Sequence, residues 1–394
     1  MTIFNDGTKV VECESIFEQL IPQCGEALKA GHISVVKGAS TGDNAIELLR
    51  KAGYKVTVIE VDKKSLFSYN TVAAKILGEE SRLVVGIGED YVMDSAKVIA
   101  SSANVPLILV PITFSGLCAL QRRAEFFCDG SLISYYLSNP AIVLLCKDFW
   151  AGQKAKEFSQ GLGYMLSYLV WTVDALYEGI IHNKGINAKT LQLLRYLVKC
   201  FGKLNSLENC NNADVVIKAA IEISALVSEL EVKSISAFSL AWFISLYKKE
   251  KISYNNYTFI AAYAILQLYC NTPDMPDMLL PADRDRALRE LEKCCGLDYS
   301  EELRQTKIGY AEDYNRRCFV TQDYREELQN LIRGEWLKNC ARYYRRLQGS
   351  SGYSMCKIIS GEELLKLLSL SGEACGGYPL LKHIKLTGLL ERYL

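Results

Sequence analysis

The chain has 394 residues, of which 49% are hydrophobic and 23% charged. These proportions are typical of globular domains and exclude a disordered chain, a collagen and a disulfide-stabilised miniprotein. At about 150 residues per domain, the length predicts two or three domains. The 45 Lys and Arg residues balance the 45 Asp and Glu residues, so the positive charge that drives non-specific nucleic-acid binding is missing and we expect no nucleic-acid partner.

The 14 cysteines are scattered and form no Cys-x-x-Cys pair, so the sequence predicts no zinc ribbon. The beginning of the sequence has neither the basic region nor the apolar region of a signal peptide. The longest apolar runs, such as 107–111 and 141–146, are far shorter than the roughly 20 residues that span a bilayer. We therefore expect a cytoplasmic protein with reduced thiols and no membrane partner.

Short β-branched runs alternate with helical segments between residues 30 and 150, which is typical of a mostly parallel sheet in an α/β domain. The predicted strands are 33–36, 55–59, 82–85, 107–110 and 141–145. The predicted crossover helices are 45–52 and 91–103, and residues 131–140 are interpreted as an excursion before the last strand.

Beyond about residue 150 the strand pattern disappears, and long segments with helical periodicity follow. The predicted helices are 153–181, 188–206, 214–232, 236–247 and 256–269. Residues 283–347 are highly charged and aromatic, and Gly349 to Ser354 read as a flexible break before a last short helix. The sequence thus predicts an α/β domain over 1–150 and an all-helical domain over 151–394.

The turn after the first predicted strand runs from Gly38 to Asp43 and leads into a helix. The free N–H groups of that helix could receive a phosphate. Glycines are also needed at any tight strand-to-helix turn, where Thr41 or Asp43 would serve as a helix cap. Both interpretations remain open.

A second strand, turn and helix follows over residues 84–97, with Asp94 and Lys97 three positions apart on one helix face. By itself this spacing is equally typical of a helical ion pair. The wider pattern has small and polar residues at fixed intervals: Gly86, Gly88, Asp94, Ala96 and Lys97, then Val105-Pro106, Pro111, Thr113 and Ser115.

This pattern resembles the iron-containing alcohol dehydrogenase and dehydroquinate synthase superfamily, and within it most closely the glycerol-1-phosphate dehydrogenase branch. Residues 140–148, 161–167 and 171–174 resemble later segments of the family. The resemblance implies a nucleotide-binding-like α/β domain followed by an all-α domain, with NAD(P) as cofactor. It places Asp94 and Lys97 at catalytic positions, and Gly86, Gly88, Asp94, Lys97, Thr113 and Ser115 at cofactor-binding positions.

The family binds a divalent metal through one Asp and two His, which polarises the substrate oxygen. By resemblance, this chain has Tyr164, Phe238 and Tyr254 at those positions, with Trp242 at a further histidine position. Since such side chains fill a cleft instead of holding a metal, we expect no metal cofactor.

The cofactor turn is altered as well, because Gly88 is followed by Glu89 and Asp90 where the family has consecutive glycines. At ~4 Å and an effective dielectric near 20, each carboxylate opposes a phosphate charge by up to ~4 kcal/mol. The sequence therefore predicts that NAD(P) binding is weakened or lost, although a small phosphorylated ligand could use the remaining pocket.

Three hypotheses follow. In the first, the chain is a catalytically silent member that acts as a binding or partner subunit, in a homo-oligomer or with an active relative. In the second, it is an active NAD(P)-dependent oxidoreductase acting on a polyol or glycerol phosphate, carried by Asp94, Lys97, Asp148 and Asp174. In the third, Tyr164, Tyr254 or Cys118 performs new chemistry in the same cleft.

The run from Arg342 to Arg346 interleaves arginines with tyrosines, a composition also found at nucleic-acid surfaces. Acidic residues nearby balance it. We interpret the charged segment as solvated helices or an oligomer contact.

Overall fold

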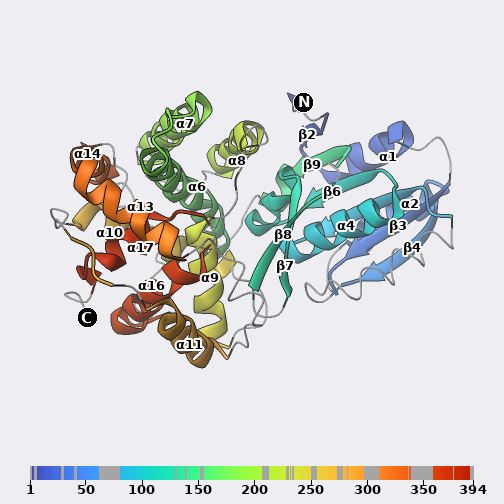
Figure 1. Ribbon diagram of the computed structural model, residues 1–394. Helices are drawn as coiled ribbons and strands as arrows, with labels where there is room; N and C mark the ends of the chain where they lie inside the picture. Colours follow the sequence, from blue (N-terminus) through green and yellow to red (C-terminus); the bar gives the residue numbers. More distant parts are fainter. Residues whose placement is uncertain are drawn as a thin grey trace. The chain divides into compact units, whose positions relative to one another are not determined.

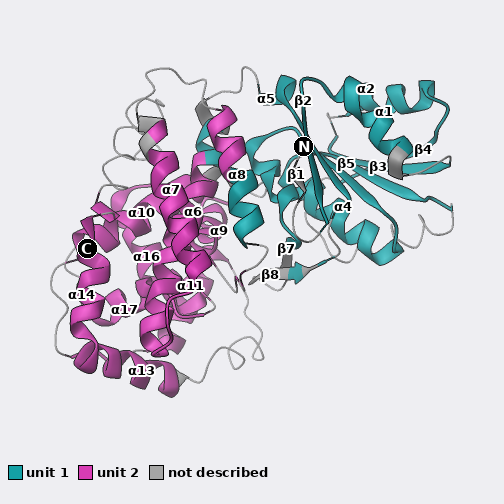
Figure 2. Ribbon diagram, turned by 90° about the horizontal axis from the view of Figure 1, so that it is seen from above, with its two compact units in different colours: residues 1–161, 220–229 teal, residues 162–219, 230–394 magenta. Residues whose placement is uncertain are grey.

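The computed structural model folds into two compact units. Unit 1 comprises residues 1–161 and 220–229, and unit 2 comprises residues 162–219 and 230–394 (Figure 2). The residues that the structure describes are 2–3, 7–27, 31–39, 42–61, 80–128, 131–137, 140–150, 155–205, 213–227, 230, 232, 235–249, 255–272, 278–281, 283–296, 310–335, 337–338, 358–375 and 377–390.

Unit 1 is built on a seven-stranded sheet in the order β1-β2-β9-β6-β5-β3-β4 (Figure 1). All neighbours pair in parallel except β1 and β2. The strands are β1 (Thr2–Ile3), β2 (Lys9–Cys13), β3 (His32–Lys37), β4 (Lys55–Glu60), β5 (Leu83–Gly88), β6 (Leu107–Pro111) and β9 (Ile142–Cys146). The five predicted strands are confirmed, and with them the α/β fold class.

Helices cover both faces of this sheet because its strands are apolar on both sides. Val85 and Ile87 of β5 pack in one cluster with α1 (Ile16–Ala27) and α2 (Asp43–Lys51). Gly86, between them, faces the other side, where α4 (Asp90–Ala103) lies against it. The predicted helices 45–52 and 91–103 therefore exist and sit on opposite faces.

Several elements of unit 1 were not predicted from the sequence. Strand β2 was not predicted, although it extends the parallel sheet beside β9. Residues 131–140, interpreted as an excursion before the last strand, include β8 (Ser131–Tyr136), which pairs with β7 (Arg123–Cys128) in an antiparallel hairpin outside the seven-stranded sheet. Helix α1 was also missed. The remaining elements of unit 1 are the 3-10 helix η1 (Phe114–Leu120) and the short α5 (Lys147–Trp150).

Unit 2 is helical throughout its described residues (Figure 1). Its helices are α6 (Ala155–Ile181, which begins in unit 1), α7 (Ala188–Asn205), α8 (Ala213–Val227, shared with unit 1), α9 (Ser236–Tyr247), α10 (Asn255–Asn271), α11 (Arg284–Cys295), α13 (Tyr310–Asp323), α14 (Arg325–Arg333), α16 (Gly361–Ala374) and α17 (Leu380–Leu386). All five predicted helices are confirmed, although α8 ends earlier than expected. None of the described helices is both long and apolar enough to cross a membrane.

Helix α6 approaches α10 very closely at Gly163. A Cβ at this position would fall 2.5 Å from the backbone nitrogen of Phe259, a distance at which the helices would have to move apart. A single glycine therefore fixes how closely α6 and α10 pack.

Within the charged segment 283–347, two charged residues of α13 are buried, which corrects the prediction of solvated helices for this helix. Arg317 of α13 is fully buried and donates a hydrogen bond to Asp313 at 2.9 Å. Lys382 reaches Asp313 at 2.7 Å and Glu373 at 3.3 Å. Because each buried charge meets an opposite charge, these ions can remain in the interior of unit 2. The run 342–346 and the break at 349–354 lie outside the described residues.

Candidate functional site

The carboxyl ends of β5 and β6 lie side by side in unit 1, and open α/β sheets bind their ligands at such an edge. The amide of Ile112 donates to the carbonyl of Gly88 at 3.1 Å, so the chain after β6 folds back across the end of β5. In that segment the hydroxyls of Thr113 and Ser115 are 2.9 Å apart. The structure thus brings together three residues that the resemblance assigns to cofactor binding.

Both glycines of this strand-turn-helix are required by local packing. A Cβ on Gly86 would fall 2.7 Å from Cβ of Ala96, on the face covered by α4. A Cβ on Gly88 would fall 2.7 Å from the side chain of Val92, in the first turns of the same helix. Their presence is therefore explained without a nucleotide.

The N-terminus of α4 begins with its own acidic residues. Glu89 is the N-cap residue and Asp90, 1% exposed, follows in the first turn. Carboxylates at this position interact favourably with the positive end of the helix dipole, which is the interaction that a phosphate would otherwise make. The charge at this turn does not fit a pyrophosphate, and we derive no hydride transfer through it.

Asp94 and Lys97 of α4 form a buried ion pair, with Nζ 3.4 Å from the carboxylate. The same ammonium donates to the carbonyls of Cys118 at 2.7 Å and Arg123 at 2.9 Å. Asp94 also accepts from the amide of Glu125 at 3.2 Å. The pair therefore joins α4 to η1 and β7, and these contacts match all three hydrogens of the ammonium. A catalytic role for the pair stays a prediction.

One charged residue at the same sheet edge was missed. Lys37 ends β3, next to the point where the strand order reverses between β3 and β5, and it is 4% exposed. Its ammonium contacts Asp43 at 2.8 Å and Glu60 at 3.1 Å, and hydrogen bonds to these two carboxylates raise its pKa. In the sequence, a lysine directly after the apolar pair Val35-Val36 could have indicated this position. Of the glycine turn beside it, Ser40 and Thr41 lie outside the described residues, and Gly42 has a left-handed backbone with φ of 84°.

In unit 2, aromatic side chains pack at the positions that resemble metal ligands. Tyr164 of α6 is 8% exposed, and its ring contacts Tyr168 with centroids 5.0 Å apart. Tyr168 in turn meets Phe238 of α9 edge to face, at 6.2 Å and 90°. We call these three residues the aromatic row. Tyr254, the third position, lies outside the described residues.

The aromatic row does not fit a divalent metal. Zinc and similar ions take thiolate, imidazole or carboxylate ligands, and the rings of Tyr168 and Phe238 supply none of them. Within the part of the chain that the structure describes, no group of three or more His, Cys, Asp or Glu residues could hold a metal ion. We therefore derive no step through a metal.

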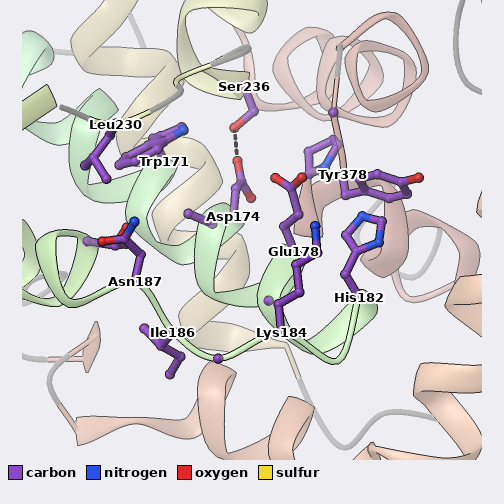
Figure 3. A pocket seen from close by; sticks show the side chains of 16 residues that line it. Trp171, Asp174, Glu178, His182, Lys184, Ile186, Asn187, Leu230, Ser236 and Tyr378 are labelled. Carbon is purple, nitrogen blue, oxygen red and sulfur yellow. Dashed lines mark hydrogen bonds between the residues drawn. The ribbon is translucent and has the colours of Figure 1, made fainter. Parts of the chain in front are cut away.

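A cavity of about 240 Å³ in unit 2 has Asp174 in its wall (Figure 3). Asp174 accepts hydrogen bonds from Ser236 at 2.7 Å, from Tyr269 at 2.8 Å and from the amide of Leu380 at 3.0 Å. Burial raises the pKa of Asp174 to about 6, and these hydrogen bonds oppose the rise. The carboxyl group therefore changes its charge near neutral pH.

Other side chains around this cavity come from α6 and from two loops. Glu178 follows Asp174 along α6, and His182 comes directly after the end of that helix. Tyr378 packs its ring edge to face on His182, with centroids 4.7 Å apart. His182 is also 2.9 Å from a guanidinium nitrogen of Arg316. The cavity combines acidic, basic and aromatic groups, and its lining does not select one class of ligand.

The remaining predicted residues are spread through unit 1. Asp148 of α5 is exposed, and its amide donates to the carbonyl of Glu14 at 3.0 Å. The Cys118 thiol lies 3.7 Å from the carbonyl of Asp90.

The comparisons with known proteins agree with this architecture. A glycerol-1-phosphate dehydrogenase [NAD(P)+] of Methanosarcina barkeri is 21% identical over 221 residues, which cover 54% of this chain and 62% of that protein. The match thus spans about three fifths of the curated relative's length. No protein-family model matches the chain.

Two solved structures have the same fold. A Red Sea brine pool alcohol dehydrogenase, described as archaeal and halo-thermophilic, superposes with a TM-score of 0.62 at 13% identity and 100% coverage of both chains. The glycerol dehydrogenase of Schizosaccharomyces pombe gives a TM-score of 0.52 at 17% identity, covering 90% of this chain and 93% of its own.

The fold is that of the iron-containing alcohol dehydrogenase and dehydroquinate synthase-like superfamily. The sequence relatives include glycerol-1-phosphate dehydrogenases, as the resemblance in the sequence predicted, and a glycerol dehydrogenase.

Proposed function

We propose that this chain is a catalytically silent relative of the glycerol-1-phosphate dehydrogenases that acts as a binding or partner subunit. The observation that supports the proposal is the aromatic row, because Tyr164 and Phe238, which the sequence resemblance assigns to metal-ligand positions, pack there as rings against Tyr168. Without a metal to polarise an alcohol oxygen, the family's reaction loses its electrophile.

The turn at α4 supports the same proposal independently. Asp90 supplies the negative charge at the helix N-terminus, and a dinucleotide would bring its phosphates against that charge. Asp94 and Lys97 are engaged with each other and with the backbone of η1 and β7. The two residues at the predicted catalytic positions thus make structural contacts within unit 1.

A second candidate is an active NAD(P)-dependent oxidoreductase acting on a polyol or glycerol phosphate. The specific observation in its favour is that Gly88 keeps its place beside Thr113 and Ser115 at the carboxyl ends of β5 and β6. The names of the curated relatives supply the cofactor and substrate class for this candidate.

Activity and nucleotide binding separate the two candidates. The purified chain is assayed with glycerol 1-phosphate or glycerol and NAD⁺ or NADP⁺, with and without zinc, beside the Methanosarcina barkeri enzyme as a positive control. We expect no turnover above background. Turnover that zinc stimulates would overturn the proposal.

Thermal unfolding with each nucleotide added singly measures binding without turnover. A nucleotide at ~100 times its dissociation constant stabilises the folded state by ~2.7 kcal/mol. We expect no shift in the unfolding midpoint. A shift without turnover leaves the chain catalytically silent but assigns it a nucleotide ligand, and a shift with turnover supports the second candidate.

The subunit part of the proposal is tested by the mass of the assembly. Light scattering over a concentration series shows whether the chain associates with itself, and mixing with an active glycerol-1-phosphate dehydrogenase shows whether it joins a relative. A strict monomer that does not bind the active enzyme would contradict a partner role.

A further inference from the structure

Two cysteines end neighbouring strands of unit 1 and face each other. Cys13 is the last residue of β2 and Cys146 the last residue of β9, and they are direct partners in the parallel register. Their sulfur atoms are 3.2 Å apart, although 133 positions separate them in the chain.

The backbone at this point can accommodate a disulfide. Neighbouring strands lie about 4.7–4.9 Å apart. This spacing falls within the range of about 4.4–6.8 Å between Cα atoms that disulfides require. Because both residues lie at strand ends, small side-chain rotations can bring the sulfurs to the bonding distance of about 2.05 Å.

The two thiols differ in protonation. The hydrogen bond with Cys146 lowers the pKa of the Cys13 thiol, against burial and the nearby carboxylates of Asp148, Glu18 and Glu14. The same contact and burial raise the pKa of Cys146. Cys13 is 8% exposed and Cys146 is fully buried. The lowered pKa thus belongs to the sulfur that a small oxidant reaches first, and the raised pKa to the thiol beside it.

We propose that Cys13 and Cys146 form a site of reversible oxidation, at which hydrogen peroxide converts the dithiol into a disulfide that links β2 to β9. The resting state is the dithiol, in keeping with the reducing compartment expected from the sequence. The pair lies at the same carboxyl edge of the sheet as Gly88, with β6 between β9 and β5, but it shares no residue with the cofactor turn or the aromatic row and does not depend on the proposed function.

The reaction balances in two steps. The Cys13 thiolate attacks one peroxide oxygen, the O–O bond breaks, and hydroxide leaves and takes a proton to become water while Cys13 becomes a sulfenic acid. The sulfur of Cys146 then attacks the Cys13 sulfur, the S–O bond breaks, and the Cys146 proton leaves with the hydroxyl as a second water. Two thiols lose two electrons, which reduce one peroxide to two waters. A dithiol reductant reverses the change by thiol exchange.

The test uses the full chain, reduced and then freed of reductant. It is treated in its native state with hydrogen peroxide or with diamide, its free thiols are alkylated, and its peptides are weighed by mass spectrometry. We expect the peptides of Cys13 and Cys146 to appear linked, with the loss of two hydrogens, and to separate again after dithiothreitol. The oxidised protein is expected to unfold at a higher temperature than the reduced protein.

Two variants control the experiment. In Cys146→Ser the link cannot form, and we expect the Cys13 sulfenic acid to persist and to be trapped by dimedone. In Cys24→Ser the link should form as in the natural chain, because Cys24 lies in the same core cluster and burial raises its pKa to about 12. If both oxidants leave Cys13 and Cys146 fully alkylatable as single thiols, or if Cys13 links mainly to another cysteine, the proposal is wrong.

Discussion

Helix α4 of unit 1 and the aromatic row of unit 2 depart from the resembled family in opposite ways. In α4 the family's residues are present, and Lys97 uses its three hydrogens on Asp94 and on two backbone carbonyls. In the aromatic row the family's residues are absent, and Tyr164 and Phe238 fill the space with rings. The retained residues of α4 and the replaced residues of the aromatic row thus have the same role, because both sets of side chains make contacts that hold the fold together.

From this comparison we expect Lys97 to stabilise the folded state. The variant Lys97→Met tests this expectation most directly. Removing the ammonium leaves the carboxylate of Asp94 buried without its ion-pair partner, which costs about 3–5 kcal/mol of unfolding free energy. Urea denaturation measures this loss. In the double variant with Asp94→Asn the buried charge is gone, and we expect much of the stability to return. A Lys97→Met protein as stable as the natural chain would contradict a structural role.

Phe238→Ala examines the aromatic row in the same way. The ring is 6% exposed, and truncating a buried Phe to Ala typically costs about 3–5 kcal/mol. We expect a value near 3, because the neighbouring rings can relax into part of the cavity. The matched control is Phe319→Ala in α13, whose ring is 49% exposed and whose loss should cost no more than about 1 kcal/mol. Equal effects from the two variants would mean that the aromatic row is not tightly packed.

Asp174→Asn tests the effect of one titratable carboxyl group on stability. Asp174 belongs neither to α4 nor to the aromatic row. The pKa of Asp174 is raised to about 6 from a usual value near 4, so the folded state binds the proton more tightly than the unfolded state. Its contribution to stability is therefore full below pH 4 and is lost as the pH rises through 6, by roughly 2–3 kcal/mol. Asparagine mimics the neutral form at every pH.

The corresponding measurement is the free energy of unfolding of both proteins from pH 4 to 7. We expect the variant to gain on the natural chain as the pH rises, and the difference to level off above pH 6. A difference that stays constant over this range would show that Asp174 does not titrate there.

The smallest expected effect is that of Asp90→Asn at the start of α4. Loss of the carboxylate weakens its interaction with the helix dipole by about 1 kcal/mol. The same change removes the charge that opposes a phosphate, so NAD⁺ and NADP⁺ are tested on this variant by thermal shift. A nucleotide that stabilises Asp90→Asn but not the natural chain would show that the charge of Asp90 alone prevents nucleotide binding.

Much of the fold was predictable because hydrophobic periodicity reflects burial. Runs such as 107–110 are apolar at every position. A strand has this pattern when both faces of its sheet are covered. Strand β2 was missed because a short run with Glu12 in it does not differ from a loop in sequence. Its burial depends on pairing with β9, which lies more than a hundred residues further along the chain.

The site was predictable only in part. The resemblance located Asp94, Lys97, Thr113 and Ser115, and it identified the aromatic replacements at Tyr164 and Phe238. It gave no indication of what Asp94 and Lys97 contact, since their partners lie in η1 and β7. It also missed Lys37 and Cys13, whose surroundings come from other strands.

The sequence by itself determined the class of fold, the long helices and the central strands, because these depend on the local order of apolar and polar residues. Only the tertiary structure decided which side chains meet. Arg317 reads in the sequence as one charge in a solvated helix, and it lies fully buried beside Asp313. Cys13 and Cys146 read as unrelated thiols, and they face each other across a strand pair. Contacts of this kind arise when distant segments pack, and no local pattern encodes them.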